Sequence, residues 1–200
     1  MTIAPNHMAP TSPLRTQATF RTVLSAVARP GTVMPIDDVV SPPSPLNPVA
    51  AAVLCTLADH DTPLFLDRRL AGRETVMAWL RFHTGAPLAE TPANSAFAAI
   101  ADSAAMPDLS LFAQGSDTYP DESTTIVAQV DHFAGDHRLI VRGPGVADTQ
   151  AFAPHPLPDG FLDQLNENRN RFPRGVDLVF AGPEAVAALP RSTRVSRGAG

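Results

Sequence analysis

Apolar residues recur along this chain at two spacings, which predict alternating helices and strands. Spacings of three and four residues, such as Phe20, Val23, Leu24 and Val27, are typical of helices. They predict helices over residues 17–28, 49–58, 74–82 and 158–168. Short apolar or β-branched runs predict strands over residues 32–36, 62–66, 96–101 and 176–181. Interleaved helices and strands indicate a layered α/β fold.

Further patterns complete the expected fold. β-Branched residues alternate with polar ones over residues 123–133 and 137–142, and Ala134-Gly135-Asp136 between them predicts an antiparallel pair. A short helix is expected over residues 107–114, and a short segment ends in Leu189-Pro190-Arg191. We therefore expect a three-layer α/β/α architecture with a mixed central sheet. The chain is expected to form one domain over residues 1–200, with 1–15 and 196–200 flexible.

Composition narrows the class of protein. A chain of 200 residues can bury roughly 70% of its unfolded surface, so it needs no disulfide or metal to fold. Its net charge is -5 and its longest basic run is Arg68-Arg69, which argues against nucleic-acid or anionic-membrane binding. The N-terminal residues lack a signal-peptide pattern, so a cytoplasmic location is expected. The one cysteine, Cys55, cannot form an internal disulfide or hold an iron–sulfur cluster alone.

The chain contains no Lys, because all 15 of its basic residues are Arg. A Walker A loop needs a Lys at its end, so a P-loop nucleotide site is excluded. An internal pyridoxal phosphate aldimine also needs a Lys amine, and no cofactor is expected. Arg remains available for bidentate contact with phosphate or carboxylate.

The stretch from Cys55 to Leu88 concentrates polar groups at the ends of predicted elements. Asp59, His60 and Asp61 could ligate a metal or act as acid and base. Adjacent strand residues point in opposite directions, so three in a row rarely meet at one ion. A turn in which Asp accepts backbone donors is the favoured interpretation, and no metal site is expected.

A second group of polar residues lies at the carboxyl end of the helix predicted over residues 74–82. It consists of Arg81, His83 and Thr84. Arg and His at that position lie near the negative end of the helix dipole, and a cation there stabilises a helix by about 0.3–1 kcal/mol. A ligand or interface role is the alternative, and His83 could titrate near neutral pH. No nucleophile motif accompanies it, so a catalytic triad is not indicated.

Three loop segments have competing interpretations. Gly143-Pro144-Gly145 follows a strand, as in a dinucleotide loop, but Pro144 removes a donor that a phosphate would use, so a tight turn is favoured. Arg174-Gly175 precedes a strand, and Arg191 is followed by Ser192 and Thr193. Arg with hydroxyl groups could clamp an anion, although surface Arg is commoner.

Six stretches follow one another along the chain: FRTVLSAVARPG, LADHDTPLFL, LRFHTGAP, RLIVRGPGV, NRNRFPRGVDLVF and LPRSTRV. Taken together they resemble the PhnH family, whose members are subunits of the carbon–phosphorus lyase system of bacterial phosphonate catabolism. Ser192 stands where Thr is expected. The resemblance implies a fold like that of pyridoxal-phosphate-dependent transferases, without the cofactor site. It further implies a homodimer that joins PhnG, PhnI and PhnJ in a core complex.

That complex, by resemblance, attaches a phosphonate to a nucleotide-derived ribose triphosphate before radical cleavage of the carbon–phosphorus bond. A single Cys cannot supply the iron–sulfur chemistry, so the chain is interpreted as an accessory subunit whose own activity stays open. The alternative is an enzyme or small-molecule-binding component with an anion site for phosphonate or nucleotide near Arg21, Arg29, His83 and Arg191. The candidate ligand or interface residues are Phe20, Arg21, Arg29, Gly31, Asp59, Asp61, Arg81, His83, Thr84, Arg174, Asp177, Arg191 and Thr193.

Overall fold

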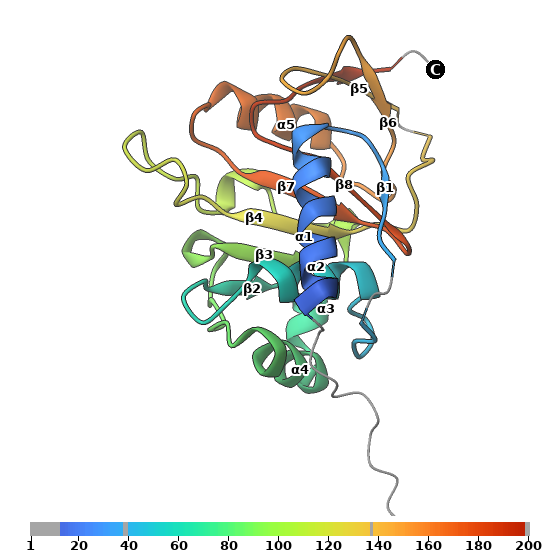
Figure 1. Ribbon diagram of the computed structural model, residues 1–200. Coiled ribbons are helices and arrows are strands. Elements are labelled where there is room, and N and C mark those ends of the chain that lie inside the picture. The colour runs from blue at the N-terminus through green and yellow to red at the C-terminus, as the bar shows by residue number, and fades with distance from the viewer. Residues whose placement is uncertain (1–12, 38–39, 137, 199–200) are drawn as a thin grey trace, which may run out of the picture.

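A six-stranded mixed sheet forms the centre of the computed structural model, which describes residues 13–37, 40–136 and 138–198 (Figure 1). In spatial order the strands are β1 (Met34–Pro35), β8 (Ala185–Leu189), β7 (Asp177–Ala181), β4 (Thr125–Gln129), β3 (Phe97–Ile100) and β2 (Leu64–Leu66). Strands β2, β3, β4 and β7 are parallel. Strand β8 is antiparallel to β7, and β1 is antiparallel to β8. The predicted mixed central sheet is confirmed.

Helices cover both faces of this sheet. On one side lies a core shared by α1 (Pro13–Ala28), α2 (Pro48–Leu57), α3 (Arg68–Ala71) and α4 (Glu74–Thr84). On the other side lie α5 (Phe161–Asn170) and a second sheet, whose strands are antiparallel. Their spatial order is β6 (Gln150–Phe152), β5 (Leu139–Arg142) and β9 (Arg194–Arg197). The described part of the chain also contains short 3-10 helices, η1 (Pro92–Asn94), η2 (Ser103–Ala105) and η3 (Leu109–Leu111). The second sheet is a feature that the sequence patterns did not predict.

Successive side chains of the central strands pack alternately into two hydrophobic cores, one on each face of the sheet. In β4, Ile126 packs into the core beside α5, whereas Val127 packs into the core beneath α1 and α2. In β7, Leu178 and Phe180 face the core beside α5, and Val179 faces the core beneath α1 and α2. Successive side chains of a strand point to opposite faces, so a strand covered on both faces is apolar throughout.

The predicted antiparallel pair over residues 123–133 and 137–142 is wrong. Strand β4 lies between β3 and β7 and is parallel to both, while β5 pairs with β6 and β9. Residue 137 lies outside the described residues. Alternating β-branched residues identify a strand but not its neighbour. The residues of β4 are buried on both faces, so β4 is a central strand and not half of an exposed hairpin.

The C-terminal part of the chain also differs from expectation. The segment ending at Leu189 is strand β8, whose run AVAAL has few of the residues that favour strands. Residues 196 and 197, expected to be loose, belong to β9, where Ser196 pairs with Ile140 and Arg197 with Leu139. At the other end, residues 13–15 form the first turn of α1, and residues 1–12, 199 and 200 lie outside the described residues.

The four predicted helices are confirmed, with small shifts at their ends. Helix α2 begins where Asn47 caps it, because the Asn47 side chain accepts a hydrogen bond from Ala50 N at 2.6 Å and Pro48 occupies the first turn. Helix α4 is capped at its carboxyl end by Gly85, whose φ of 71° favours glycine. The predicted helix over residues 107–114 is reduced to the single turn η3. Within the described ranges, no helix combines the length and apolar character needed to cross a membrane.

The contact between the two sheets generates a first prediction. Phe180 of β7 is 0% exposed, and its ring lies 5.3 Å from that of Phe152 in β6 and 6.4 Å from that of Phe161 in α5. We expect Phe180→Ala to lower the free energy of unfolding by about 3–5 kcal/mol in a urea titration, because it leaves a cavity where three elements meet.

The control for this variant is Phe82→Ala, because Phe82 is 60% exposed. We expect that change to stay within about 0.5 kcal/mol of the wild type. Equal losses for the two variants would contradict the packing described here.

Candidate functional site

A crevice of about 640 Å³ opens where the parallel strands of the central sheet end. It is bounded by the residues that follow β3, β4 and β7, by α3 and by the start of α2. Its polar lining residues are Asn47, Arg69, Asp102, Ser103, Gln129 and Asp131. Open α/β sheets commonly bind ligands at the carboxyl ends of their strands, because the loops there diverge around a space.

Asn47 and Gln129 fix one wall of this crevice. The Asn47 side chain caps α2 and donates to Ala181 O at 2.9 Å, at the end of β7. Gln129 accepts from Asn47 N at 2.6 Å and donates to Pro45 O at 2.9 Å. The two side chains therefore tie the loop before α2 to the ends of β4 and β7.

Asp67 fixes the opposite wall. Its side chain is buried and accepts hydrogen bonds from Leu70 N at 2.9 Å, Ala101 N at 2.8 Å and Asp102 N at 2.9 Å. One carboxylate therefore caps α3 and holds the residues that follow β3, while Ser103 Oγ donates to Gln129 O at 2.5 Å. A lining held by this many bonds is preorganised.

Three charged side chains at the crevice have no bonding partner among the described residues. They are Arg69, Asp102 and Asp131. A guanidinium can contact a phosphate or carboxylate, and carboxylates accept hydrogen bonds from hydroxyl groups. The lining can therefore recognise a molecule that carries both an anionic group and hydroxyl groups.

None of the predicted site residues lines this crevice. A usable signal was present in the sequence, since polar residues lie at the ends of two predicted strands. Asp102-Ser103 follow the strand over 96–101, and Asp131 lies near the end of the one over 123–133. Recognising it required knowing that β3 and β4 are parallel neighbours, because only then do their carboxyl ends meet.

Arg191 and Asp177 form a closed internal cluster. Asp177 accepts from the Arg191 backbone N at 2.8 Å and from its Nε at 3.2 Å to each carboxylate oxygen. The remaining guanidinium nitrogens donate to Asp177, to Ser123 Oγ and to Pro120 O. The two side chains are only 14% and 29% exposed. The Arg191 guanidinium is thus occupied within the fold.

This cluster lies at the amino ends of the parallel strands, whereas the crevice lies at their carboxyl ends. We call these two sides of the sheet the amino edge and the carboxyl edge. Asp177 is the first residue of β7, and Ser123 precedes β4. Arg174, also before β7, forms a 3.1 Å ion pair with Asp117 in which the two side chains are 47% and 85% exposed. Arg174 and Arg191 therefore both lie at the amino ends of the strands, each beside an acid.

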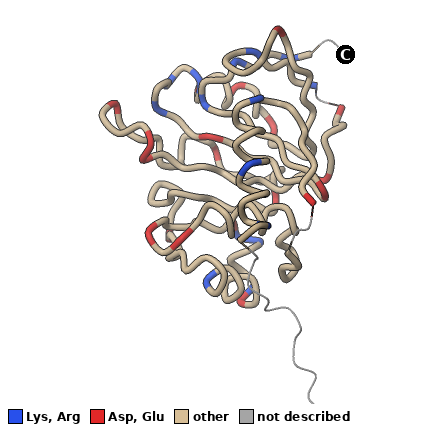
Figure 2. The backbone as a smooth tube through the Cα atoms, in the orientation of Figure 1, with Lys and Arg blue, Asp and Glu red and all other residues tan. Residues whose placement is uncertain are grey.

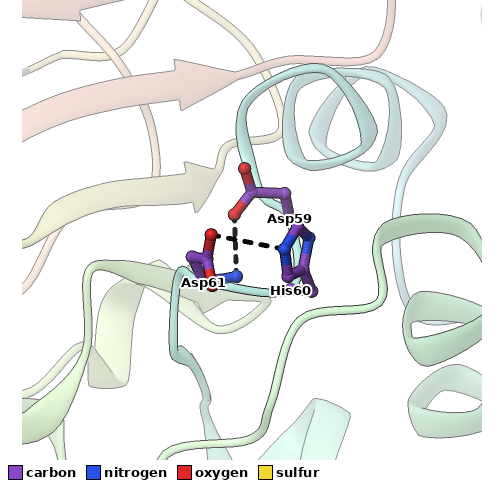
Figure 3. Close-up of side chains that lie close together, drawn as sticks. All are labelled: Asp59, His60 and Asp61. Carbon is purple, nitrogen blue, oxygen red and sulfur yellow. Dashed lines mark hydrogen bonds and ion pairs between the residues drawn. The ribbon is translucent and has the colours of Figure 1, made fainter.

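Asp59, His60 and Asp61 form an exposed turn between α2 and β2 (Figure 3). Asp59 Oδ1 accepts from Asp61 N at 3.0 Å, and His60 Nε2 lies 3.3 Å from Asp61 Oδ2. Possible ligand atoms of the three lie within 4.8 Å of one another. The Asp59 carboxylate also accepts from Thr62 Oγ1 at 3.1 Å, which is the local bonding of an Asp-initiated turn.

The end of α4 lies beside this turn, since a Cβ on Gly85 would be 3.7 Å from His60 Cβ. Arg81 is exposed in the last helical turn, and Thr84 Oγ1 donates to Leu80 O at 2.8 Å. The ring of His83 lies 4.1 Å from that of Trp79. Burial lowers the pKa of His83 below its usual value, which favours the neutral imidazole.

Phe20, Arg21, Arg29 and Gly31 lie along α1 and just beyond it. Arg21 and Arg29 line a shallow depression of about 350 Å³ together with Val33, and neither His83 nor Arg191 belongs to it. Gly31 has a φ of 75° and donates from its N to Ala188 O at 2.9 Å. A Cβ there would approach Gln150, Val141 and Phe152 at 3.1–3.3 Å, so Gly31 is a packing position between the two sheets.

Thr193 is the last predicted site residue and lies between β8 and β9. It is 5% exposed, and its Oγ1 has no hydrogen-bond partner among the described residues. Its backbone N donates to Pro190 O at 2.9 Å. The predicted residues thus divide among the amino edge, the α4 end and α1, and do not converge on one pocket.

Comparison with known proteins gives concordant matches over nearly the whole chain. The family model for PhnH, described as a bacterial phosphonate metabolism protein, matches residues 10–196. The chain is 42% identical over 181 residues to the alpha-D-ribose 1-methylphosphonate 5-triphosphate synthase subunit PhnH of Rhizobium meliloti (strain 1021), covering 90% of each protein. It is 30% identical over 189 residues to the putative C-P lyase subunit protein HtxG of Stutzerimonas stutzeri, covering 91% of this chain and 86% of that protein.

The two Arg–Asp pairs generate a second prediction. We expect Arg191→Ala to lower the free energy of unfolding by about 2–3 kcal/mol, because it leaves the half-buried Asp177 without its cation and several charged hydrogen bonds. Arg174→Ala, which removes an exposed pair, should cost at most about 1 kcal/mol. Urea titration of both variants measures the difference. Similarly small losses would instead leave Arg191 available as an anion clamp.

Proposed function

This chain belongs to the PhnH family of bacterial phosphonate metabolism proteins, and from that membership we propose that it acts as a subunit of a phosphonate-processing complex. In that role it supports attachment of an alkylphosphonate to a ribose triphosphate before the carbon–phosphorus bond is cut. The observation that carries this proposal is the 42% identity, over 90% of both chains, to a protein named as a synthase subunit.

The described side chains support an accessory role. Two candidate anion-binding residues have internal partners: Arg191 is bonded to Asp177, and Arg174 to Asp117. Cys55 is partly buried, and burial raises the pKa of its thiol to about 12, so it is a poor nucleophile at neutral pH. Chemistry on the phosphonate is therefore assigned to partner subunits.

The partners that we propose are those the family resemblance implies. They are a second copy of this chain and the PhnG, PhnI and PhnJ subunits. A symmetric dimer would use the same surface on both copies and bury a total of about 1,600 Å². The relatives' names describe subunits and so support assembly in general.

We further propose that the central sheet is related to that of pyridoxal-phosphate-dependent transferases. Its mixed strand directions and the helices on both faces support this relationship. A chain with no Lys could not retain the internal aldimine of those enzymes, so the fold would serve here without that chemistry.

A second candidate function is binding of a small phosphorylated sugar in the crevice at the carboxyl ends of the strands. The unpaired Arg69 favours an anionic group, and Asp102 and Asp131 favour hydroxyl groups nearby. This candidate retains the alternative function that the sequence suggested but moves it away from Arg21, His83 and Arg191.

Co-purification tests the proposed subunit role. We expect the tagged full-length chain, co-expressed with PhnG, PhnI and PhnJ from the same genome, to recover all three. The isolated chain should have the mass of two copies by light scattering at micromolar concentration. An unrelated tagged protein is the control. A chain that recovers none of the three subunits would refute the proposed role, and a monomer would refute the dimer alone.

Calorimetric titration with ribose 5-phosphate tests the crevice. We expect Arg69→Ala to weaken binding by at least about tenfold, because it removes the only Arg among the described lining residues. Arg68→Ala is the matched control, because Arg68 is the neighbouring exposed Arg outside the lining. Asp102→Asn should weaken binding as well. Affinities equal to that of the wild type would place the ligand elsewhere.

A further inference from the structure

Helix α1 exposes three large apolar side chains in one row, which we call the α1 stripe. Phe20 is 43% exposed, Leu24 50% and Val27 38%, and their spacing of four and three residues places them on one face of the helix. The helix is anchored by another face, where Val23 and Ala26 are 4% and 0% exposed. A surface helix normally turns its apolar stripe toward the core, so this stripe has the character of a contact surface.

Positive charge borders the α1 stripe. Arg21 follows Phe20 directly, and Arg29 lies just beyond the end of the helix; both side chains are exposed and have no bonding partner among the described residues. Helix α1 contains no Asp or Glu, nor do α2, β1 and β8, which pack against it. Figure 2 shows α1 facing the viewer with basic positions and no acidic ones. This local excess stands out in a chain whose net charge is -5.

We propose that the α1 stripe, with Arg21 and Arg29, is the docking surface for a different protein subunit that presents an apolar face bordered by acidic residues. The proposal rests on the proposed function and specifies the partner's chemistry. The unpaired guanidinium groups need acidic partners once the apolar contact excludes water, and charge complementarity also selects the partner.

A second copy of this chain fits the surface poorly. In a two-fold contact the same residues of both copies meet. Arg21 and Arg29 of one copy would then face those of the other, and α1 offers no acid to separate them. The homodimer proposed above is therefore assigned to another face of the molecule.

The test uses the tagged full-length chain co-expressed with PhnG, PhnI and PhnJ. One variant, Phe20→Ser with Leu24→Ser, removes the apolar contact, and another, Arg21→Glu with Arg29→Glu, reverses the charge. Matched controls are Phe82→Ser and Arg68→Glu, which make the same changes at exposed positions on α4 and α3. We expect both α1 variants to lower recovery of the partners at least about tenfold and both controls to retain it.

Two further measurements separate docking from folding. Circular dichroism and the Tm should be unchanged in the charge-reversal variant, because exposed Arg residues without partners contribute little to stability. Recovery by the wild-type chain should fall as salt is raised from about 50 mM to about 500 mM, since screening weakens attraction between charges at the rim of an interface.

Each alternative outcome has a defined meaning. Full recovery by both α1 variants overturns the docking surface and leaves the proposed function standing. Failure of the wild-type chain to recover any subunit overturns the proposed function and the docking surface with it. If the α1 variants dissociate the isolated dimer in light scattering, the occupant is a second copy. If instead they abolish sedimentation with anionic phospholipid vesicles, the occupant is a membrane, and in either case the proposal is wrong.

Discussion

Parallel pairing of β4 with β7, over residues buried on both faces, is the constraint on which the rest of this molecule depends. The pairing runs from Thr125 with Asp177 to Gln129 with Ala181. Strands joined in this way require a long crossover, and their two faces require cover. The crossover supplies β5, β6 and α5 to one face, while α1 and α2 cover the other. The second sheet is thus the packing layer carried by the crossover, completed when β9 returns beside β5.

Parallel strands also make the two edges of the sheet chemically different. At the amino edge, Asp177 and Arg191 neutralise each other and bond to the chain around Ser123, so that edge is closed. At the carboxyl edge, Asn47, Asp67 and Gln129 fix the loops around a crevice that is bordered by charged side chains without partners among the described residues. The same kinds of side chain stabilise one edge and leave the other open, and the difference lies in whether each charged group finds a partner within the chain.

Helix α1 packs against the core with one face and exposes apolar side chains on another. Val23 and Ala26 bind it to the core formed with α2 and β8, and the α1 stripe stays outside. Phe20 and Leu24 are 43% and 50% exposed, so covering the remainder of each would stabilise the protein by about half of the roughly 1.5–3 kcal/mol that full burial gives. A component of a complex recovers that free energy on assembly. Membership of a family whose named relatives are subunits fits this arrangement.

The sequence by itself determined the local elements and the family. Apolar spacing located the helices, because each helix buries one side of its repeat, and short apolar runs located most central strands, which are buried on both faces. The absence of Lys excluded two classes of site without any structure. Only the tertiary structure decided which elements are neighbours. The alternation in residues 123–142 was compatible with a hairpin, yet β4 joined β3 and β7, because strand pairing is set by contacts between residues distant in the chain. For the same reason, the sequence left open whether Arg191 clamps an anion or lies on the surface, and only the structure shows it bonded to Asp177. The crevice likewise depends on the tertiary structure, because its lining comes from loops that only the parallel sheet brings together.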